Sequence, residues 1–263
     1  MKVTFKEGIR SKILLGISLV AVLLFASNIA ITNLFAFELG KVMVDIGFSA
    51  LSICGLSIVF FLAINLLSRD IHDKTVYMIL SKPVTRSQYI WGKFGGLALI
   101  LATAFVILGL LTIISFYICC SFVAGAYLPR NFSWHMASIT ISFSFLSLLV
   151  LMATAFFFTV NCSSMYLAML VTFCTYMLGN TLETIVRIME RGEFVKTSVA
   201  FTKIMKIITW IVPNFAAFDL KSNLAYGLPT NASYLLWTGA YGCFYTIGII
   251  MVTAAIFKRM DIC

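Results

Sequence analysis

A polar segment at residues 69–93 interrupts an otherwise apolar chain, and its side chains are of the kinds that bind charged surfaces. It contains five Lys or Arg residues, two Asp, one His and one of only four prolines. Such residues can form ion pairs and hydrogen bonds with water, with lipid headgroups or with another protein, but not with hydrocarbon. The surface that this segment binds is therefore the main indication of function.

Two other kinds of chemistry are not supported by the residue pattern. The seven cysteines include no CxxC pair, and His72 and His135 are isolated, so the cysteines are interpreted as small apolar fillers of helices. A phosphate-binding loop, GxxxxGK, would require a glycine where Ser87 stands before Gly92 and Lys93. The chain therefore has no nucleotide-binding loop, and energy for any work must come from a partner.

Composition indicates an all-α integral membrane protein. The chain is 61% hydrophobic and 11% charged, whereas soluble domains are about 45–50% apolar and about 25% charged. Long apolar runs, rather than alternating ten-residue segments, favour helices over a barrel. Each span needs about 20 residues. The expected spans of this single transmembrane domain are residues 13–35, 46–68, 92–118, 136–160, 164–182 and 233–257.

The distribution of Lys and Arg predicts the orientation of these six spans. Positive residues gather at the N-terminus, in the polar loop 69–91 and in the tail, whereas the opposite short loops carry only Lys41 and Arg130. Both termini and the polar loop are therefore expected in the cytoplasm. Residues 1–12 have the spacing of an amphipathic helix along the inner leaflet, although an ordinary positively charged flank fits them equally well.

The connection at residues 183–232 is expected on the outer face. Apolar residues recur at helical spacing from Phe201 to Trp210, and Pro213 then ends the pattern. We interpret this segment as one or more interfacial or re-entrant helices.

Apart from Lys93, at the entry of the third span, no Asp, Glu, Lys, Arg or His lies inside an expected span. Proton-coupled transporters, intramembrane hydrolases and channels commonly need such groups, so these classes are disfavoured. Sodium sites built from carbonyl and hydroxyl oxygens remain open.

Within the polar loop, the pattern predicts a break followed by a capped helix. Lys82 and Pro83 end a first helical turn, and Thr85 with Gln88 has the spacing of a capping box for the next helix. Gly92 and Gly96 form a GxxxG motif that permits close helix packing at the start of the third span. A solvated loop with no partner is the alternative interpretation.

These residues resemble a known family. An acid and a Thr, an apolar run, then Lys-Pro-Val-Thr-Arg and Gly-Lys resemble the type-2 ABC exporter permeases. The six-span subfamily that includes the permease for nitrous oxide reductase maturation is the more similar one. VPNFAAFDLKSNLAYG at residues 212–227 and FKRMD at residues 257–261 are similar to its outer segment and its ending. His72 and Lys74 depart from the second acid and the Gly that often stand in this motif.

The resemblance implies a homodimer in a bacterial inner membrane, with each copy bound to a cytoplasmic ABC ATP-binding subunit. ATP and Mg would be held by that subunit, with no cofactor or catalytic residue in this chain. The loop between the second and third spans would be the coupling helix. The residues implied in ATPase coupling are Asp70, Thr75, Leu80, Lys82, Pro83 and Arg86, with Gly92, Lys93 and Gly96 opening the next span.

Other functions remain open at this point. The short link at residues 161–164 is a second candidate contact with the ATPase. An outer-face accessory protein is also compatible with the long outer segment, and nothing indicates nucleic acid binding. The alternatives to an exporter are a membrane scaffold or force-transmitting anchor that docks a cytoplasmic partner, and a secondary transporter.

Overall fold

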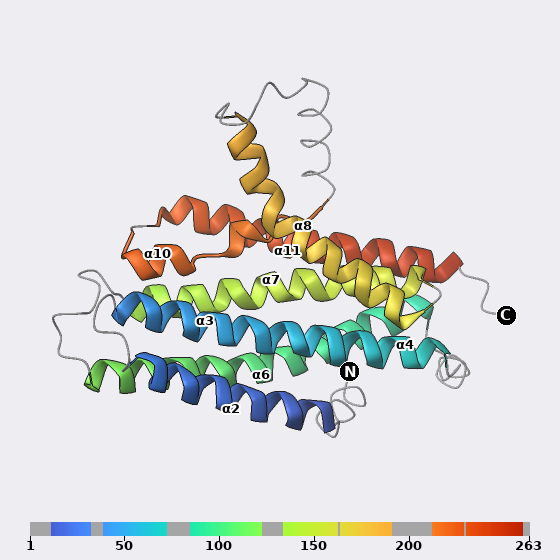
Figure 1. Ribbon diagram of the computed structural model, residues 1–263. Coiled ribbons are helices and arrows are strands. Elements are labelled where there is room, and N and C mark those ends of the chain that lie inside the picture. Colours follow the sequence, from blue (N-terminus) through green and yellow to red (C-terminus); the bar gives the residue numbers. More distant parts are fainter. Residues whose placement is uncertain are drawn as a thin grey trace.

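The computed structural model describes residues 12–32, 39–72, 85–122, 134–162, 164–190, 212–228 and 230–259. All the regular structure within these residues is helical, as expected. The helices of the bundle are α2 (Lys12–Thr32), α3 (Leu39–Ser57), α4 (Asn65–His72), α6 (Arg86–Phe122), α7 (Trp134–Asn161), α8 (Met165–Glu190) and α11 (Ala232–Arg259). They alternate in direction along the chain, with α3 and α4 running in the same direction as parts of one helix (Figure 1). They lie side by side, except that the second half of α8 projects away from the bundle.

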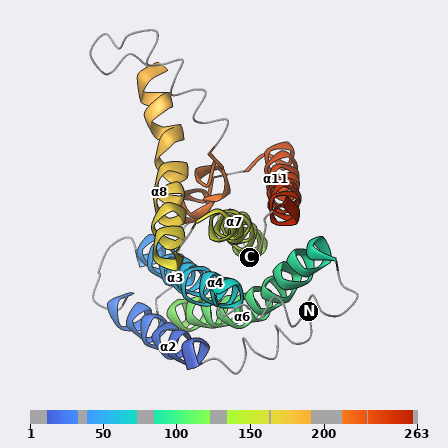
Figure 2. The same cartoon turned by 90° about the vertical axis from the view of Figure 1, so that its right-hand side faces the viewer.

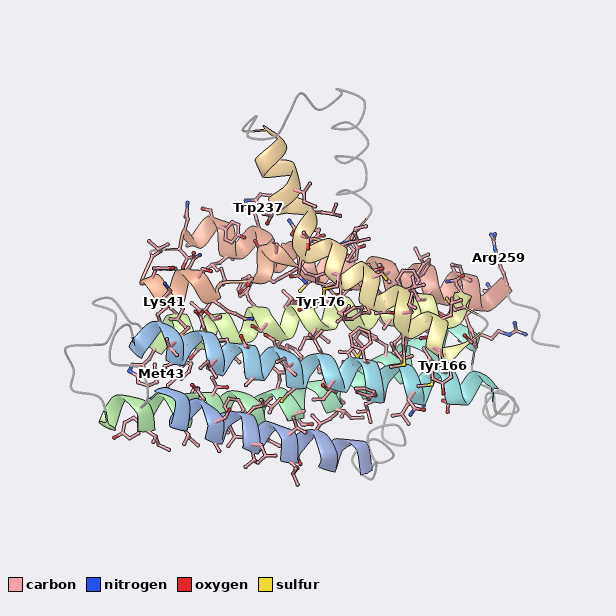
Figure 3. The ribbon with its side chains drawn as sticks, viewed as in Figure 1. Lys41, Met43, Tyr166, Tyr176, Trp237 and Arg259 are labelled. Atoms are coloured by element: carbon pink, nitrogen blue, oxygen red, sulfur yellow. The ribbon has the colours of Figure 1, made fainter. Side chains whose placement is uncertain are left out.

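Because the helices alternate in direction, different elements meet at the two ends of the bundle. At the α4 end, α4 finishes, α6 begins, and α11 finishes at Arg259 (Figures 1 and 3). At the α10 end lie Lys41 near the start of α3, the start of α7 and the short helix α10 (Lys221–Tyr226). The end of α4, the start of α6 and the end of α11 are thus neighbours.

Five helical segments of the described residues are long and apolar enough to cross a membrane. They are Lys41–Ser68, Arg86–Ile118, Trp134–Asn161, Met165–Leu182 and Ala232–Arg259. The N-terminal helix contributes a shorter apolar stretch, Gly16–Asn28. A chain with several such helices is a multi-pass membrane protein.

Helix α7 forms the centre of the bundle, with α3, α6, α8 and α11 around it (Figure 2). Its side chains from Leu151 to Phe156 are all buried. The ring of Phe156 meets Phe94 of α6 edge to face at 5.5 Å between centroids, a favourable aromatic geometry. Gly55 of α3 permits close approach, because a Cβ there would clash with Leu148 and Phe105.

The second long helix is continuous from Leu39 to His72, but its middle is not α-helical. Residues Ile58–Ile64 form the π-helix η1, and both flanking residues, Ser57 and Asn65, keep right-handed helical backbone angles. The helix begins before the expected position 46 because its first turns pack against α10: Met43 and Val44 are buried beside Leu224. The Lys41 ammonium also lies 4.5 Å from the centre of the Tyr226 ring.

The segment at residues 212–228 folds back over the bundle at the α10 end. It contains the 3₁₀ turn η3 (Ala216–Phe218) and α10. Gly227 ends α10 at φ 63°, a left-handed conformation that favours glycine, and Leu228 N donates to Asn223 O at 2.9 Å.

Two earlier expectations lie outside the described residues: the amphipathic helix at residues 1–12, apart from Lys12, and the helix around residues 201–210.

Candidate functional site

The candidate site lies where α4 ends before the polar loop and α6 begins after it. Helix α6 begins with the expected capping box. Gln88 N donates to Thr85 Oγ1 at 3.3 Å, and Thr85 N donates to Gln88 Oε1 at 3.0 Å. These bonds satisfy two backbone donors that a helix start otherwise leaves unpaired. The capping prediction is confirmed, and the start of α6 is fixed at the loop.

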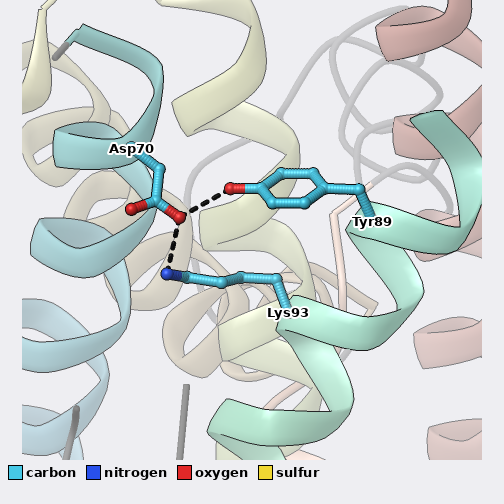
Figure 4. Close-up of polar contacts among 3 residues, drawn as sticks. All are labelled: Asp70, Tyr89 and Lys93. Carbon is cyan, nitrogen blue, oxygen red and sulfur yellow. Dashed lines mark hydrogen bonds and ion pairs between the residues drawn. The ribbon is translucent and has the colours of Figure 1, made fainter. Parts of the chain in front are cut away.

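One carboxylate oxygen joins the two sides of the loop. Asp70 Oδ2, on α4, accepts hydrogen bonds from Lys93 Nζ and from the Tyr89 hydroxyl, each at 2.6 Å (Figure 4). Tyr89 and Lys93 stand four residues apart and therefore share one face of α6. We call these three residues the loop clamp.

The environment of the clamp makes its ion pair structurally important. The Lys93 side chain is 5% exposed and that of Asp70 is 15% exposed. Removing one partner of a buried pair leaves an uncompensated charge, which costs about 3–5 kcal/mol. The clamp therefore fixes the spacing of α4 and α6 where the polar loop leaves them.

The last helix also contacts this site. The Tyr89 ring stacks on Phe257 at 6.0 Å between centroids, and Phe257 is buried. Arg86 Nη1 donates to the carbonyl oxygen of Lys258 at 3.4 Å. The start of α6 is thus bound to α4 on one side and to the end of α11 on the other.

The structure brings together only part of the expected coupling set. Asp70 and Lys93 meet in the clamp, and Arg86 lies about one turn before Tyr89, which also donates to Asp70. Thr75, Leu80, Lys82 and Pro83 lie outside the described residues.

The two glycines of the GxxxG motif differ. Gly96 is buried. At Gly92 no atom lies within 4 Å of the place that a Cβ would occupy. Among the described residues nothing packs on Gly92, so the close helix contact expected there stays a prediction.

The second candidate contact, the link between α7 and α8, also lies at the α4 end. Asn161 Nδ2 donates to Phe157 O at 2.7 Å, and Leu167 N donates to Ser164 Oγ at 3.3 Å. Both side chains are exposed and serve as local helix caps. Neither side chain carries a charge, so this link provides a partner protein with fewer charged groups to bind than the polar loop does.

Tyr89 and Phe257 were not expected from the sequence as members of the site. A signal for Tyr89 exists: it precedes Lys93 by one helical turn, and Asp70 closes the preceding span. Among the described residues no group of three or more His, Cys, Asp or Glu could hold a metal. Through its two hydrogen bonds to Asp70, the clamp positions the two ends of the polar loop.

At the opposite end, the 212–228 segment is bound to α8 and α11. Asn214 N donates to the Tyr241 hydroxyl at 3.1 Å, and Phe215 N donates to Gly179 O at 3.2 Å. The Tyr234 hydroxyl donates to Ala217 O at 2.8 Å. Two of these three partners belong to α11, which therefore contacts the loop clamp at its end and this segment near its start.

Comparison with known protein families identifies the family of this chain. No curated protein matches the chain. The model of the family described as ABC-2 family transporter protein matches residues 1–262, which is almost the whole chain. With its apolar helices and its charged loop clamped at one end of the bundle, this chain belongs to the ABC-2 family of transporter permeases.

Proposed function

We propose that this permease subunit is driven by ATP hydrolysis in a separate ATP-binding subunit, which binds the loop between α4 and α6. The observation that carries the proposal is the loop clamp. A docking loop transmits movement only if its two ends are held in a fixed relation to the helices that must move. Asp70, Lys93 and Tyr89 supply that relation with charge-assisted hydrogen bonds.

The finer features of the proposal follow from the loop and the family. The α4 end faces the cytoplasm, with both termini, and α2 completes six spans in a bacterial inner membrane. Two copies form a homodimer, with each copy bound to an ATP-binding subunit that holds ATP and Mg. Residues 70–86 make the coupling contact. Transport is outward.

The experiment is co-purification followed by activity measurement. Tagged chain, expressed with its ATP-binding subunit, is purified in detergent and reconstituted, and ATPase activity is compared with that of the free subunit. Replacing Pro83 and Arg86 by Ala is expected to reduce coupled ATPase activity at least several-fold while membrane insertion remains intact. The matched control is Ser222→Ala, at an exposed position of α10 on the opposite end of the bundle. If no ATP-binding subunit co-purifies, or if the double variant keeps full activity, the proposal is wrong.

A second function is favoured by one specific observation, the two-ended contact of α11. At one end Phe257 and Lys258 meet Tyr89 and Arg86; at the other Tyr241 and Tyr234 hold the 212–228 segment. A single straight helix between these contacts can convey force from the coupling loop to an accessory protein on the outer face. In this case the chain acts as a force-transmitting anchor rather than as a conduit.

Spin labels distinguish this second function from transport. One label is placed at exposed Ala232 of α11 or Leu228 of the segment, and a second at exposed Tyr166 of α8. Force transmission predicts that trapping the ATP-bound complex changes the distance between labels, and that Tyr89→Phe diminishes the change. An unchanged distance in an actively hydrolysing complex would leave the conduit as the function.

A further inference from the structure

A small polar cavity lies in the α10-end half of the bundle, away from the loop clamp. It occupies about 50 Å³ between α3, α7 and α8 and is closed on one side by the 212–228 segment, through Phe215 and Phe218. Its polar lining comes from all of these elements. The residues are Ser52, Ser144, Ser147, Tyr176, Asn180 and Asp219.

The serines of this cavity behave differently from the other hydroxyl residues of the same helix. Along α7, Ser138 and Ser142 donate to the carbonyls of Trp134 and Ser138, at 3.2 and 3.0 Å. Such bonds to the preceding turn are the ordinary way to satisfy a hydroxyl in a membrane helix. By contrast, the hydroxyls of Ser52, Ser144 and Ser147, which line the cavity, form no hydrogen bond with any residue that the structure describes.

These three hydroxyls therefore need a partner inside the cavity. The three side chains are partly exposed, and an unpaired hydroxyl at membrane depth is unfavourable because hydrocarbon offers no donors or acceptors. A site for one water needs roughly 10–15 Å³ on the same measure. The cavity thus has room for about three to five waters, or for a solute of about that many non-hydrogen atoms.

The charges around the cavity indicate which solutes fit. The deeper lining consists of hydroxyl, phenol and amide groups, which carry no charge. Asp219 and Lys221 both line the cavity from the 212–228 segment, and Asp219 Oδ1 accepts a hydrogen bond from Lys221 N at 3.1 Å. One acid and one base balance each other, so the site does not favour an ion of either sign.

A second, larger hollow on the bundle provides a contrast. It occupies about 340 Å³ between α6 and α7 and is lined mainly by apolar side chains such as Phe105, Leu110 and Phe145. Its two serines, Ser138 and Ser142, are the ones whose hydroxyls bond to their own helix. Of the serines that line these two hollows, only those of the polar cavity thus lack a hydrogen bond to their own helix.

We propose that the polar cavity is a binding site for a small uncharged solute that carries hydroxyl, carbonyl or amide groups. The 212–228 segment is its cover, and water fills the site when solute is absent. The cover is attached by few bonds, Asn214 N to the Tyr241 hydroxyl and Phe215 N to Gly179 O. This inference goes beyond the proposed coupling to ATP, because it depends on neither the polar loop nor a partner subunit.

The test uses two alkylating reagents of nearly equal shape, uncharged chloroacetamide and anionic chloroacetate. Ser147→Cys and Ser144→Cys are made in the full-length chain, reconstituted in vesicles, with Ser142→Cys as the matched control on the same helix. A thiolate sulfur displaces chloride to form a thioether, and the thiol proton passes to water. Because peptide mass spectrometry reads the modified position, the native cysteines remain in place.

The expected result has three parts. Chloroacetamide alkylates Cys at 147 or 144 at least ten-fold faster than at 142. The ratio of the chloroacetamide rate to the chloroacetate rate is larger at these positions than it is for free cysteine. Excess acetamide slows the reaction, whereas the same concentration of sodium acetate does not.

Other results overturn the proposal. Alkylation at 147 and 144 no faster than at 142 means that the cavity is closed to solutes. Equal protection by acetamide and acetate means that the site does not select uncharged molecules. If either variant fails to fold, judged by its melting and elution profile, Ser52→Cys tests the same cavity from α3. The measurement needs no ATPase, so it stands or falls separately from the coupling proposal.

Discussion

The carboxylate of Asp70 and the ammonium of Lys93 meet at 2.6 Å across the two helices that carry the polar loop. Twenty-two residues separate them along the chain, yet they are the fixed points between which the loop is held. Both side chains are largely shielded from water. The loop can therefore vary in sequence while its two ends keep their separation.

Breaking this ion pair is expected to be costly. Asp70→Asn or Lys93→Met alone leaves one buried charge without its partner, and each should destabilise the chain by about 3–5 kcal/mol. The double variant removes both charges, so it should lose less than the sum of the single losses. Thermal unfolding in detergent measures these effects, with Lys258→Met at an exposed position as the control. Strictly additive losses would contradict the direct pairing.

The Tyr89 hydroxyl should contribute independently of the Tyr89 ring. Tyr89→Phe removes the hydrogen bond to a charged acceptor, worth about 1.5–3 kcal/mol, but keeps the stacking on Phe257. A lower unfolding temperature is expected. Tyr166→Phe is the control, because that side chain is 82% exposed. Equal melting of the two variants would mean that the hydroxyl has no structural role.

The capping box should govern local order at the start of α6. Thr85→Ala is expected to cost about 0.5–2 kcal/mol, because Gln88 N loses its acceptor. Hydrogen exchange should become faster at the backbone amides of Ser87 and Gln88, and Thr85→Ser should largely restore protection. Unchanged exchange in Thr85→Ala would show that the rest of the helix holds this turn.

Gly179 should be intolerant of a side chain. A Cβ there would collide with the carbonyl oxygen of Pro213 and with the Phe215 ring. Gly179→Ala should therefore displace the 212–228 segment and cost about 1–3 kcal/mol. Gly248→Ala is the matched control, since no atom lies within 4 Å of its Cβ position. It should be neutral or stabilising by up to about 1 kcal/mol. Similar stability of both variants would show that the 212–228 segment moves to accommodate the added Cβ at little cost in free energy.

The helical architecture and the start of α6 follow from local sequence, which is why both could be predicted. Apolar runs specify the long helices, and the capping box depends only on Thr85 and Gln88. Helix ends are less accessible to this reasoning, because tertiary contacts set them. The α3 helix begins at Leu39 through packing against α10, and α8 continues to Glu190, beyond the expected residue 182.

The polar contacts were the least predictable part of the structure. A tyrosine such as Tyr89 near the end of a span is also typical of a membrane interface. In the same way, a serine in a span is compatible with bonding to its own helix, as Ser142 does, or with facing a cavity, as Ser147 does. Only the packing of three helices and the covering segment distinguishes the two cases.

The π-helical turns at Ile58–Ile64 have a consequence for the whole second span. Each residue of an α-helix advances the chain by about 100° around the axis, and the wider π-helix advances it by less. Every side chain after Ile64, including Asp70, thus has an angular phase that depends on how these seven residues are hydrogen-bonded. A change from π to α hydrogen bonding would rotate α4 about its own axis while Ser52 and the α10 end keep their positions. The span therefore contains a pivot between α3 and α4, at which Asp70 can change its direction without any break in the helix.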